Sequence, residues 1–389
     1  QLTKINRDDL KENLLVGRTH PKLKNLDSPS NKNLNSIFKI LRKKNILLHH
    51  PYDLFKTSVE EFINRAADDP LVMAIKITLY RVSKDSPIIA ALMRAAENGK
   101  EIMTLVELKA RFDEDNNIQW AKQLEQAGIH VVYGIIGFKT HTKIALIVRK
   151  EKGRLRNYFH IGTGNYNSNT SRFYTDLGLL STDPDIASDL LELFNYLSGF
   201  SKQKSYQKLL VSPSSMREKF IFLIKREIKN AGEGKKAEII AKMNSLVDPE
   251  IIKLLYLASE SGVKISLIIR GICCLYPQRK NLSENIKVIS IIGPFLEHSR
   301  IFWFCNNDDN EVFIGSADWM RRNLDRRIEA VTPIEDFGLK FQLKALLQRY
   351  IKDDYFSWIM KENGSYAKEP LDSANNRSQI DLIEQQKQY

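Results

Sequence analysis

The sequence has few cysteines, no long apolar run and no methionine at its first position. Its three cysteines, Cys273, Cys274 and Cys305, include no CxxC pair. Because three thiols do not make a disulfide framework, we expect a reduced, cytoplasmic setting. We expect neither a bilayer-spanning helix nor a signal peptide. The chain starts at Gln1 with a polar segment, so we expect it to be the C-terminal part of a longer protein.

The chain has an excess of positive charge. It carries 59 Lys and Arg against 47 Asp and Glu, a formal net charge of +12 in 389 residues. Hydrophobic residues make up 43%, which favours a packed core over a disordered chain. A basic surplus favours polyanionic partners, among them nucleic acid, anionic membrane, nucleotides and polyphosphate. Charge alone does not choose among them.

Short apolar runs alternate with helical patterns in the first half of the chain. Pro87 and Gly99 mark the start and end of one helix, and Ser58 is the expected N-cap of another. The patterns predict strands at 47–52, 71–79, 102–108, 130–135 and 144–148, and helices at 58–67, 87–98 and 118–126. Strands alternating with helices of this size indicate an α/β fold.

The second half repeats the first. A helix at 249–261, Gly262 and a strand at 264–269 mirror the helix at 87–98, Gly99 and the strand at 102–108. Two copies of such length predict paired domains rather than a solenoid. We therefore expect a lead-in at 1–35 from a missing upstream region, domains at 36–205 and 206–366, and a polar, disordered tail at 367–389.

Each half contains one histidine station, defined here as a histidine with a cation two residues later. The stations are His141 with Lys143 and His298 with Arg300. Along a strand, residues two apart point to the same face, so each station presents an imidazole beside a cation. A neutral imidazole can attack phosphorus or act as acid or base near neutral pH, and cations stabilise phosphoryl oxygens. The two stations predict a phosphate-sized site between the halves.

A glycine turn follows each station, at Gly162–Asn165 and at Gly315–Asp318. Backbone N–H groups of such turns, and an amide such as that of Asn165, can bind further phosphate oxygens. The arginine pairs at 321–322 and 326–327 are either a solvated face or further lining of the same site. A single His-x-Lys is usually solvated surface, but two stations in matching order within a repeat favour catalysis.

Longer motifs resemble one family. The resemblance covers the chain from about Ser36 to about Tyr366. The motifs lie at 75–81, 106–114, 139–143, 162–167, 269–275, 297–300 and 316–320, and they are similar to those of polyphosphate kinases of the long, histidine-phosphorylating family. This resemblance implies two tandem phospholipase D-like domains, each a mixed β-sheet flanked by helices, with the active site between them.

The resemblance also implies a reaction. It is the reversible transfer of the terminal phosphate of ATP to inorganic polyphosphate, with His141 as the phosphohistidine nucleophile and His298 as its acid/base partner. The implied partners are ATP, ADP and polyphosphate rather than nucleic acid, with Mg²⁺ as cofactor. A homo-oligomer is expected for the full-length protein, and peripheral membrane contact is compatible with the basic charge.

Further site residues follow from the matching motifs. Tyr174 and Arg270 match nucleotide-contacting positions, and Lys143, Arg300, His298 and Asn165 are expected to bind ATP or its phosphates. Arg81 and Arg111 match positions that the family associates with magnesium. Because a guanidinium has no lone pair to give to a metal, we expect these two arginines to bind phosphate oxygens that in turn hold Mg²⁺.

Two other functions stay open. One is a phospholipase D-like phosphodiesterase or nuclease. Such stations normally carry an acid five residues beyond the lysine, where this sequence has Val148 and Cys305, and Arg300 replaces the second lysine. These departures argue against hydrolysis. The other is an inactive polyanion-binding fragment, because nothing here matches the family's two upstream domains.

Overall fold

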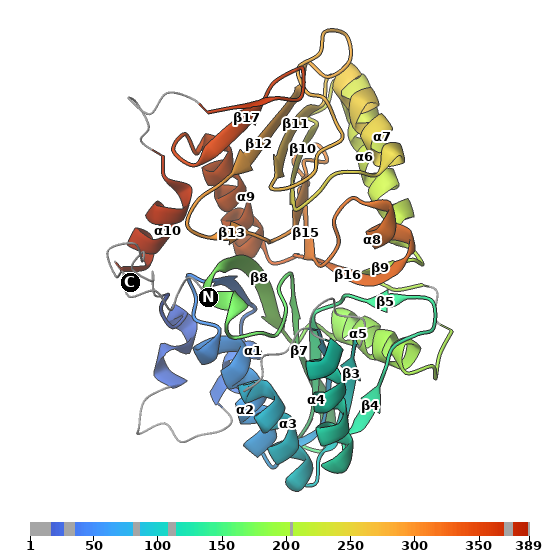
Figure 1. Cartoon of the computed structure of the whole chain (residues 1–389), viewed down its shortest axis with the longest axis vertical. Coiled ribbons are helices and arrows are strands. Elements are labelled where there is room, and N and C mark those ends of the chain that lie inside the picture. Colours follow the sequence, from blue (N-terminus) through green and yellow to red (C-terminus); the bar gives the residue numbers. More distant parts are fainter. Residues whose placement is uncertain are drawn as a thin grey trace.

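The computed structural model describes residues 17–26, 36–80, 86–107, 114–202, 205–368 and 376–387. Within these residues the chain forms two mixed β-sheets, one of eight strands and one of ten. Figure 1 shows one sheet above the other, with the first half of the chain in blue to green below and the second half in yellow to red above. The α/β class expected from the sequence is confirmed.

The first sheet combines a parallel part with an antiparallel part. Strands β4, β3 and β2 are parallel, and β6, β7, β8 and β1 continue the sheet in antiparallel order. Their bounds are β1 Ile46–His50, β2 Val72–Leu79, β3 Glu101–Val106, β4 His130–Val132, β6 Ile144–Glu151, β7 Arg154–Gly162 and β8 Tyr174–Ser181.

The second sheet repeats this order. Strands β12, β11 and β10 are parallel, and β14, β15, β16 and β9 continue in antiparallel order, with β17 and β18 added beside β12. The bounds are β9 Leu210–Ser212, β10 Glu238–Met243, β11 Lys264–Ile269, β12 Ile286–Ile291, β14 Ile301–Phe304, β15 Glu311–Gly315, β16 Arg327–Pro333, β17 Ser357–Met360 and β18 Tyr366–Ala367. The internal repeat inferred from the sequence therefore extends to the whole sheet order.

The two halves exchange one short strand each. Strand β5 (Lys139–Thr140) leaves the first half and pairs in parallel with β16, while β13 (Leu296–Glu297) leaves the second half and pairs in parallel with β8. The exchange is reciprocal, because β16 and β8 occupy the same place in their two sheets. Each sheet is thereby completed by the other half of the chain.

The helices pack with the sheets in three large hydrophobic clusters. Helices α1 to α4 pack with the first sheet, α6 and α7 pack with the second, and α5 and α9 share one cluster with strands of both sheets. The bounds are α1 Ser36–Leu41, α2 Glu61–Asp68, α3 Pro87–Glu97, α4 Glu114–Gln126, α5 Pro184–Leu197, α6 Met216–Gly232, α7 Pro249–Glu260, α8 Arg321–Asp325, α9 Phe337–Lys352 and α10 Ser378–Lys387, with shorter helical turns η3 Pro21–Leu26, η4 Lys56–Glu60 and η5 Thr170–Arg172. The shared cluster ties the halves into one core.

Local chemistry explains the helix ends that the sequence predicted. Helix α7 begins with Pro249 at its first turn, and the Asp248 side chain accepts hydrogen bonds from the next backbone N–H groups. Gly99 and Gly262 follow α3 and α7 with φ of 75° and 89°, which favours glycine.

The prediction of Ser58 as an N-cap is wrong. The backbone is already helical at Phe55, and the chain enters α2 through the π-helical turn η4. Ser58 lies inside this segment, where its hydroxyl donates to Leu54 O at 2.6 Å. The Ser58 hydroxyl is therefore hydrogen-bonded inside the helical segment, and Ser58 does not cap the start of a helix.

The prediction of a disordered tail at 367–389 is wrong for residues 378–387, which form α10. Ser378 and Gln379 are fully buried, and Ile383 packs against Tyr52 and Phe295. The Gln379 side chain accepts from Phe295 N and donates to Phe295 O, both at 2.9 Å. The polar composition of the tail did not indicate this contact, because its buried polar groups form hydrogen bonds with other buried groups.

No helix within the described ranges is long and apolar enough to cross a membrane. The limits expected for the lead-in and the two domains stay predictions.

Candidate active site

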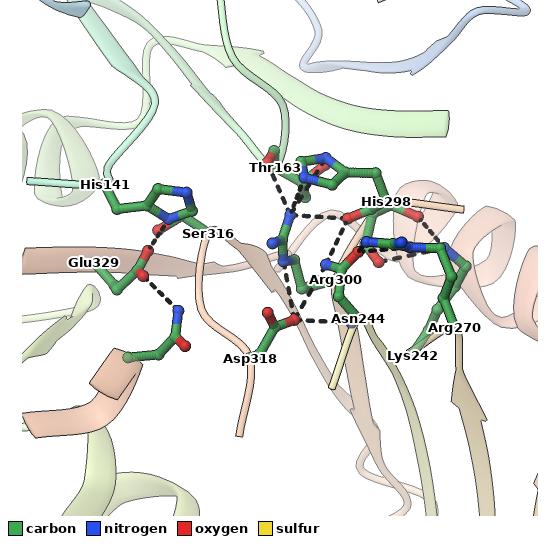
Figure 2. Close-up of polar contacts among 12 residues, drawn as sticks. His141, Thr163, Lys242, Asn244, Arg270, His298, Arg300, Ser316, Asp318 and Glu329 are labelled. Carbon is green, nitrogen blue, oxygen red and sulfur yellow. Dashed lines mark hydrogen bonds and ion pairs between the residues drawn. The ribbon is translucent and has the colours of Figure 1, made fainter. Parts of the chain in front are cut away.

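Both histidine stations lie directly after the exchanged strands. His141 follows β5, and its backbone N–H donates to Ile328 O at 2.8 Å on β16. His298 follows β13, and its N–H donates to Thr175 O at 3.2 Å on β8. One half therefore supplies each histidine, and the other half holds its backbone. The structure brings His141 and His298 to the junction of the halves, as Figure 2 shows.

His141 is backed by a buried carboxyl group of the second half. Its Nδ1 lies 2.8 Å from Glu329 Oε2, and the Glu329 side chain is fully buried on β16. The other carboxyl oxygen accepts from Asn323 Nδ2 at 2.5 Å. An ionised carboxylate can only accept, so it fixes the proton on Nδ1 and leaves the lone pair on Nε2. In this tautomer Nε2 carries the free lone pair, so it is the ring atom that could act as a nucleophile.

His298 has the mirror arrangement. Its Nδ1 lies 2.8 and 3.0 Å from the two carboxyl oxygens of Asp176 on β8 in the first half. Thr163 Oγ1 donates to Asp176 at 2.5 Å. The ring of Tyr174 lies against the imidazole, with 5.2 Å between centroids. Each catalytic candidate is thus oriented by an acid from the opposite half.

Sequence reasoning missed both acids, although a signal was present. Glu329 stands 14 residues after Gly315, and Asp176 stands 14 residues after Gly162 (315 + 14 = 329 and 162 + 14 = 176). Counting acids from the glycine turns in both copies would have found them. The acids of phospholipase D-type stations are expected five residues beyond the lysine, where this chain has Val148 and Cys305.

The station cations bond to the backbone of their own histidines. Lys143 Nζ donates to His141 O, and Arg300 Nη1 donates to His298 O at 2.8 Å. Arg300 Nε also donates to Asp318 Oδ1 at 3.2 Å. The residue that corresponds to Asp318 in the first glycine turn is Asn165, so the turns differ in charge. Both cations are buried.

The structure places the expected nucleotide residues beside His298. The guanidinium of Arg270 donates to Asn244 Oδ1 at 2.6 and 3.0 Å, and Asn244 Nδ2 donates to His298 O at 3.3 Å. Asn165 lies in the first turn, and its buried side-chain oxygen has no hydrogen-bond partner among the described residues. Arg81 and Arg111 lie outside the described residues.

Burial and the cations nearby favour the neutral form of the His141 ring. Burial, together with Lys143, Arg327 and Arg300, lowers the pKa of His141 well below its usual range. Burial lowers the pKa of Lys143 to about 7, although Glu329 opposes this shift. Arg327, from the basic run beside the second turn, therefore belongs to the site. A neutral imidazole surrounded by cations suits attack on a phosphoryl group.

The two acids differ in their electrostatic setting. Burial raises the pKa of Glu329 to about 7, with Lys143 and Ser316 opposing the rise. Burial would raise the pKa of Asp176 too, but His298 and Thr163 outweigh it and hold that pKa below its usual range. Burial lowers the pKa of His298, and Asp176 opposes this. The pKa of Asp176 therefore lies below that of Glu329.

Each half of the chain matches a family model of its own. Residues 36–203 match the family model of polyphosphate kinase C-terminal domain 1, and residues 209–379 match that of C-terminal domain 2. The chain belongs to the polyphosphate kinase family. A polyphosphate kinase of Parasynechococcus marenigrum is 65% identical over 352 residues, which are 90% of this chain and 49% of the relative. One of Prochlorococcus marinus is 62% identical over 371 residues, or 95% of this chain and 52% of the relative.

The chain spans about half the length of these polyphosphate kinases. The crystal structure of polyphosphate kinase from Porphyromonas gingivalis matches with a TM-score of 0.84 at 37% identity, covering 93% of this chain and 55% of that chain. A phosphatidylserine synthase from Haemophilus influenzae matches with a TM-score of 0.59 at 11% identity, covering 89% of this chain and 92% of that chain, which concerns the fold alone. The expected family is confirmed, and so is the expected architecture of two tandem domains, each with a mixed β-sheet flanked by helices.

Proposed function

We propose that this chain holds the catalytic centre of a polyphosphate kinase. The reaction is reversible transfer of the terminal phosphate of ATP to inorganic polyphosphate through a phosphohistidine on His141. The observation that carries the proposal is the pair of histidines, each bonded through Nδ1 to an acid of the opposite half. Family membership supports the same reaction, since the relatives named above are polyphosphate kinases.

In the first step His141 Nε2 attacks the terminal phosphorus of ATP. The N–P bond forms, the bond from phosphorus to the bridging oxygen breaks, and ADP leaves with the electron pair on that oxygen. The imidazole gains positive charge, which the Glu329 carboxylate at Nδ1 stabilises. In its protonated form, with one N–H on Asp176, His298 can donate its Nε2–H to the leaving oxygen. Lys143 and Arg300 neutralise the phosphoryl oxygens.

In the second step a terminal oxygen of polyphosphate attacks the phosphohistidine. The new P–O bond forms as the N–P bond breaks, and the electron pair returns to Nε2 of His141. The polymer is one phosphate longer, and the imidazole is neutral again. Because both steps use the same groups on similar phosphates, the reverse reaction makes ATP from ADP.

In this proposal Mg²⁺ is bound to the phosphates of the nucleotide. Among the residues that the structure describes, no group of three or more His, Cys, Asp and Glu side chains could hold a metal ion. Arg81 and Arg111 lack a lone pair for a metal, so their proposed role is to bind the phosphates that hold Mg²⁺. Both steps above are written through protein side chains alone.

Labelling with ATP that carries ³²P on its terminal phosphate tests the proposal. The wild type is expected to take up label that is stable in base and labile in acid, and His141→Ala is expected to take up none. His130→Ala is the control, because His130 is exposed on β4 away from both stations. Equal labelling of His141→Ala and wild type would refute the assignment.

The same assay distinguishes the other two functions. Release of a nucleoside monophosphate or of phosphatidate without ATP would indicate a phosphodiesterase. Polyphosphate binding with steep salt dependence but no ADP formation would indicate a binding fragment. Because the chain spans about half of its relatives, each assay is run beside a longer version with the upstream half restored. The cytoplasmic location and the homo-oligomer stay predictions.

A further inference from the structure

A buried ion pair lies directly beside His298 of the second station. Lys242 Nζ lies 2.9 Å from Glu297 Oε2, and both side chains are 2% exposed. The same ammonium group donates to Ser299 Oγ at 2.6 Å and to Ser299 O at 3.2 Å. Glu297 and Ser299 are the residues immediately before and after His298. The pair therefore holds the backbone on both sides of the histidine.

In the first half the segment before His141 is held differently: the buried Glu107 side chain accepts from Thr140 N at 2.7 Å, and no lysine stands at the place of Lys242. Thr78 occupies the place of Lys242, one residue before the end of the equivalent strand, and donates to Thr142 O at 2.9 Å. Thr142 corresponds to Ser299, and Thr140 corresponds to Glu297. Three neutral residues of the first half thus stand where the second half has a lysine, a glutamate and a serine.

Further groups immobilise Glu297. Its Oε2 accepts from Thr175 Oγ1 at 2.7 Å, and its Oε1 accepts from Gln379 Nε2 at 2.6 Å. Gln379 belongs to α10 and also binds both backbone groups of Phe295. Residues 295, 297 and 299 are therefore all held by hydrogen bonds from other parts of the chain, and helix α10 takes part.

Stability does not explain this arrangement. Removing a lysine and a glutamate from water costs free energy that their mutual attraction often fails to recover, and apolar replacements of a buried pair are often neutral or stabilising. The threonines of the first half show that this fold accommodates neutral side chains at the same positions. What the charged pair adds is a fixed position for the segment that carries His298.

We propose that Lys242 and Glu297 are positioning residues for phosphoryl transfer, which hold His298 in line with the phosphate while Asp176 orients its ring. This inference rests on the proposed function. It assigns the asymmetry of the repeat to the different tasks of the two histidines. The attacking histidine acquires a covalent phosphate, whereas its partner must present one fixed nitrogen to the leaving oxygen.

The test replaces the pair without emptying its space, using Lys242→Met, Glu297→Gln and the double variant. We expect the double variant to fold and to lower kcat of polyphosphate synthesis about tenfold or more, with KM for ATP changed less than about twofold. Each single variant leaves one buried charge without its partner, so both singles are expected to be less stable than the double variant.

The matched control is another buried ion pair, Arg149 with Asp69, at 2.9 Å and with side-chain exposures of 4% and 0%. It lies near the end of β6 away from Lys143, so Arg149→Met with Asp69→Asn should lower Tm but leave kcat unchanged. If the Lys242/Glu297 double variant kept wild-type kcat, or if the control lost as much kcat at equal loss of Tm, the positioning role would be refuted.

A readout without turnover separates this inference from the proposed function. In protein with ¹⁵N-labelled histidine, the ring signals of His298 should shift or broaden in the double variant and not in the control. A wild type that makes no polyphosphate would refute the proposed function, and the ring signals would still decide the positioning role. Unchanged His298 signals in the double variant would overturn it.

Discussion

Glu329→Gln separates the two effects of the acid behind His141. Glutamine has nearly the same shape and can still accept a hydrogen bond from Nδ1, but it cannot balance the positive charge that the imidazole would gain in the proposed attack of Nε2 on phosphorus. The perturbation therefore removes charge while it keeps the 2.8 Å contact that orients the ring. We expect slower formation of phosphohistidine with little change in ATP binding.

The size of this effect follows from hydrogen-bond energies. A hydrogen bond to a charged group contributes about 1.5–3 kcal/mol, and a neutral one about 0.5–1.5 kcal/mol. The lost stabilisation is then about 1–2 kcal/mol, which corresponds to a rate about 5- to 30-fold lower. A larger effect would mean that the ring had also lost its orientation.

Stability should change in the opposite direction. Burial raises the folded-state pKa of Glu329 from 4.5 to about 7, so the folded protein keeps this proton to a higher pH than the unfolded chain does. Its contribution to stability is present below about pH 4.5 and is lost as the pH rises through about 7, a loss of about 3 kcal/mol. Glutamine does not ionise, so the variant should gain stability relative to wild type across this window.

Two measurements check this prediction. Rapid-quench labelling with γ-³²P ATP gives the rate of phosphohistidine formation, and urea unfolding at pH 5 and pH 8 gives the stability difference. Glu227→Gln is the control, because Glu227 is buried, its pKa is raised by burial, and its partners are two backbone N–H groups and Arg226, none of which belongs to the stations. An unchanged labelling rate in Glu329→Gln would contradict the role of the carboxylate.

The acid behind His298 allows two further predictions. Asp176→Asn should lower kcat about tenfold, as outer contacts of catalytic histidines commonly do; steady-state polyphosphate synthesis measures this, and a change below twofold would argue against the role of Asp176. Gly164→Ala should have a similar effect, because a Cβ there would lie 2.3 Å from Asp176 Oδ2. Gly232→Ala is its control, since that Cβ meets nothing within 4 Å, and full activity of Gly164→Ala would show that the acid can move without loss.

Local patterns in the sequence predicted much of the fold. Proline and glycine marked the ends of α3 and α7, and apolar runs marked β2, β3 and β6, because these signals act over a few residues. Ser58 shows the limit of such signals: a serine before an apolar helix is an N-cap only if the preceding backbone is not already helical.

Long-range pairing set the rest of the site. His141 and Glu329 are 188 residues apart, and His298 and Asp176 are 122 apart. Their contacts depend on the parallel pairing of β5 with β16 and of β13 with β8. A strand of two residues has no recognisable sequence pattern, so this pairing could not be predicted. The buried role of Gln379 was hidden for the same reason, since its partner Phe295 lies 84 residues earlier.

The strand exchange has the form of an isologous interface, in which the same surface serves both sides of a two-fold axis. The chain is therefore a covalently linked pseudo-dimer. Neither half, made separately, would contain a complete station, because each histidine would lack its acid and each sheet would lack a strand. Each half matches a family model of its own, but the proposed catalytic site forms only where the two halves meet.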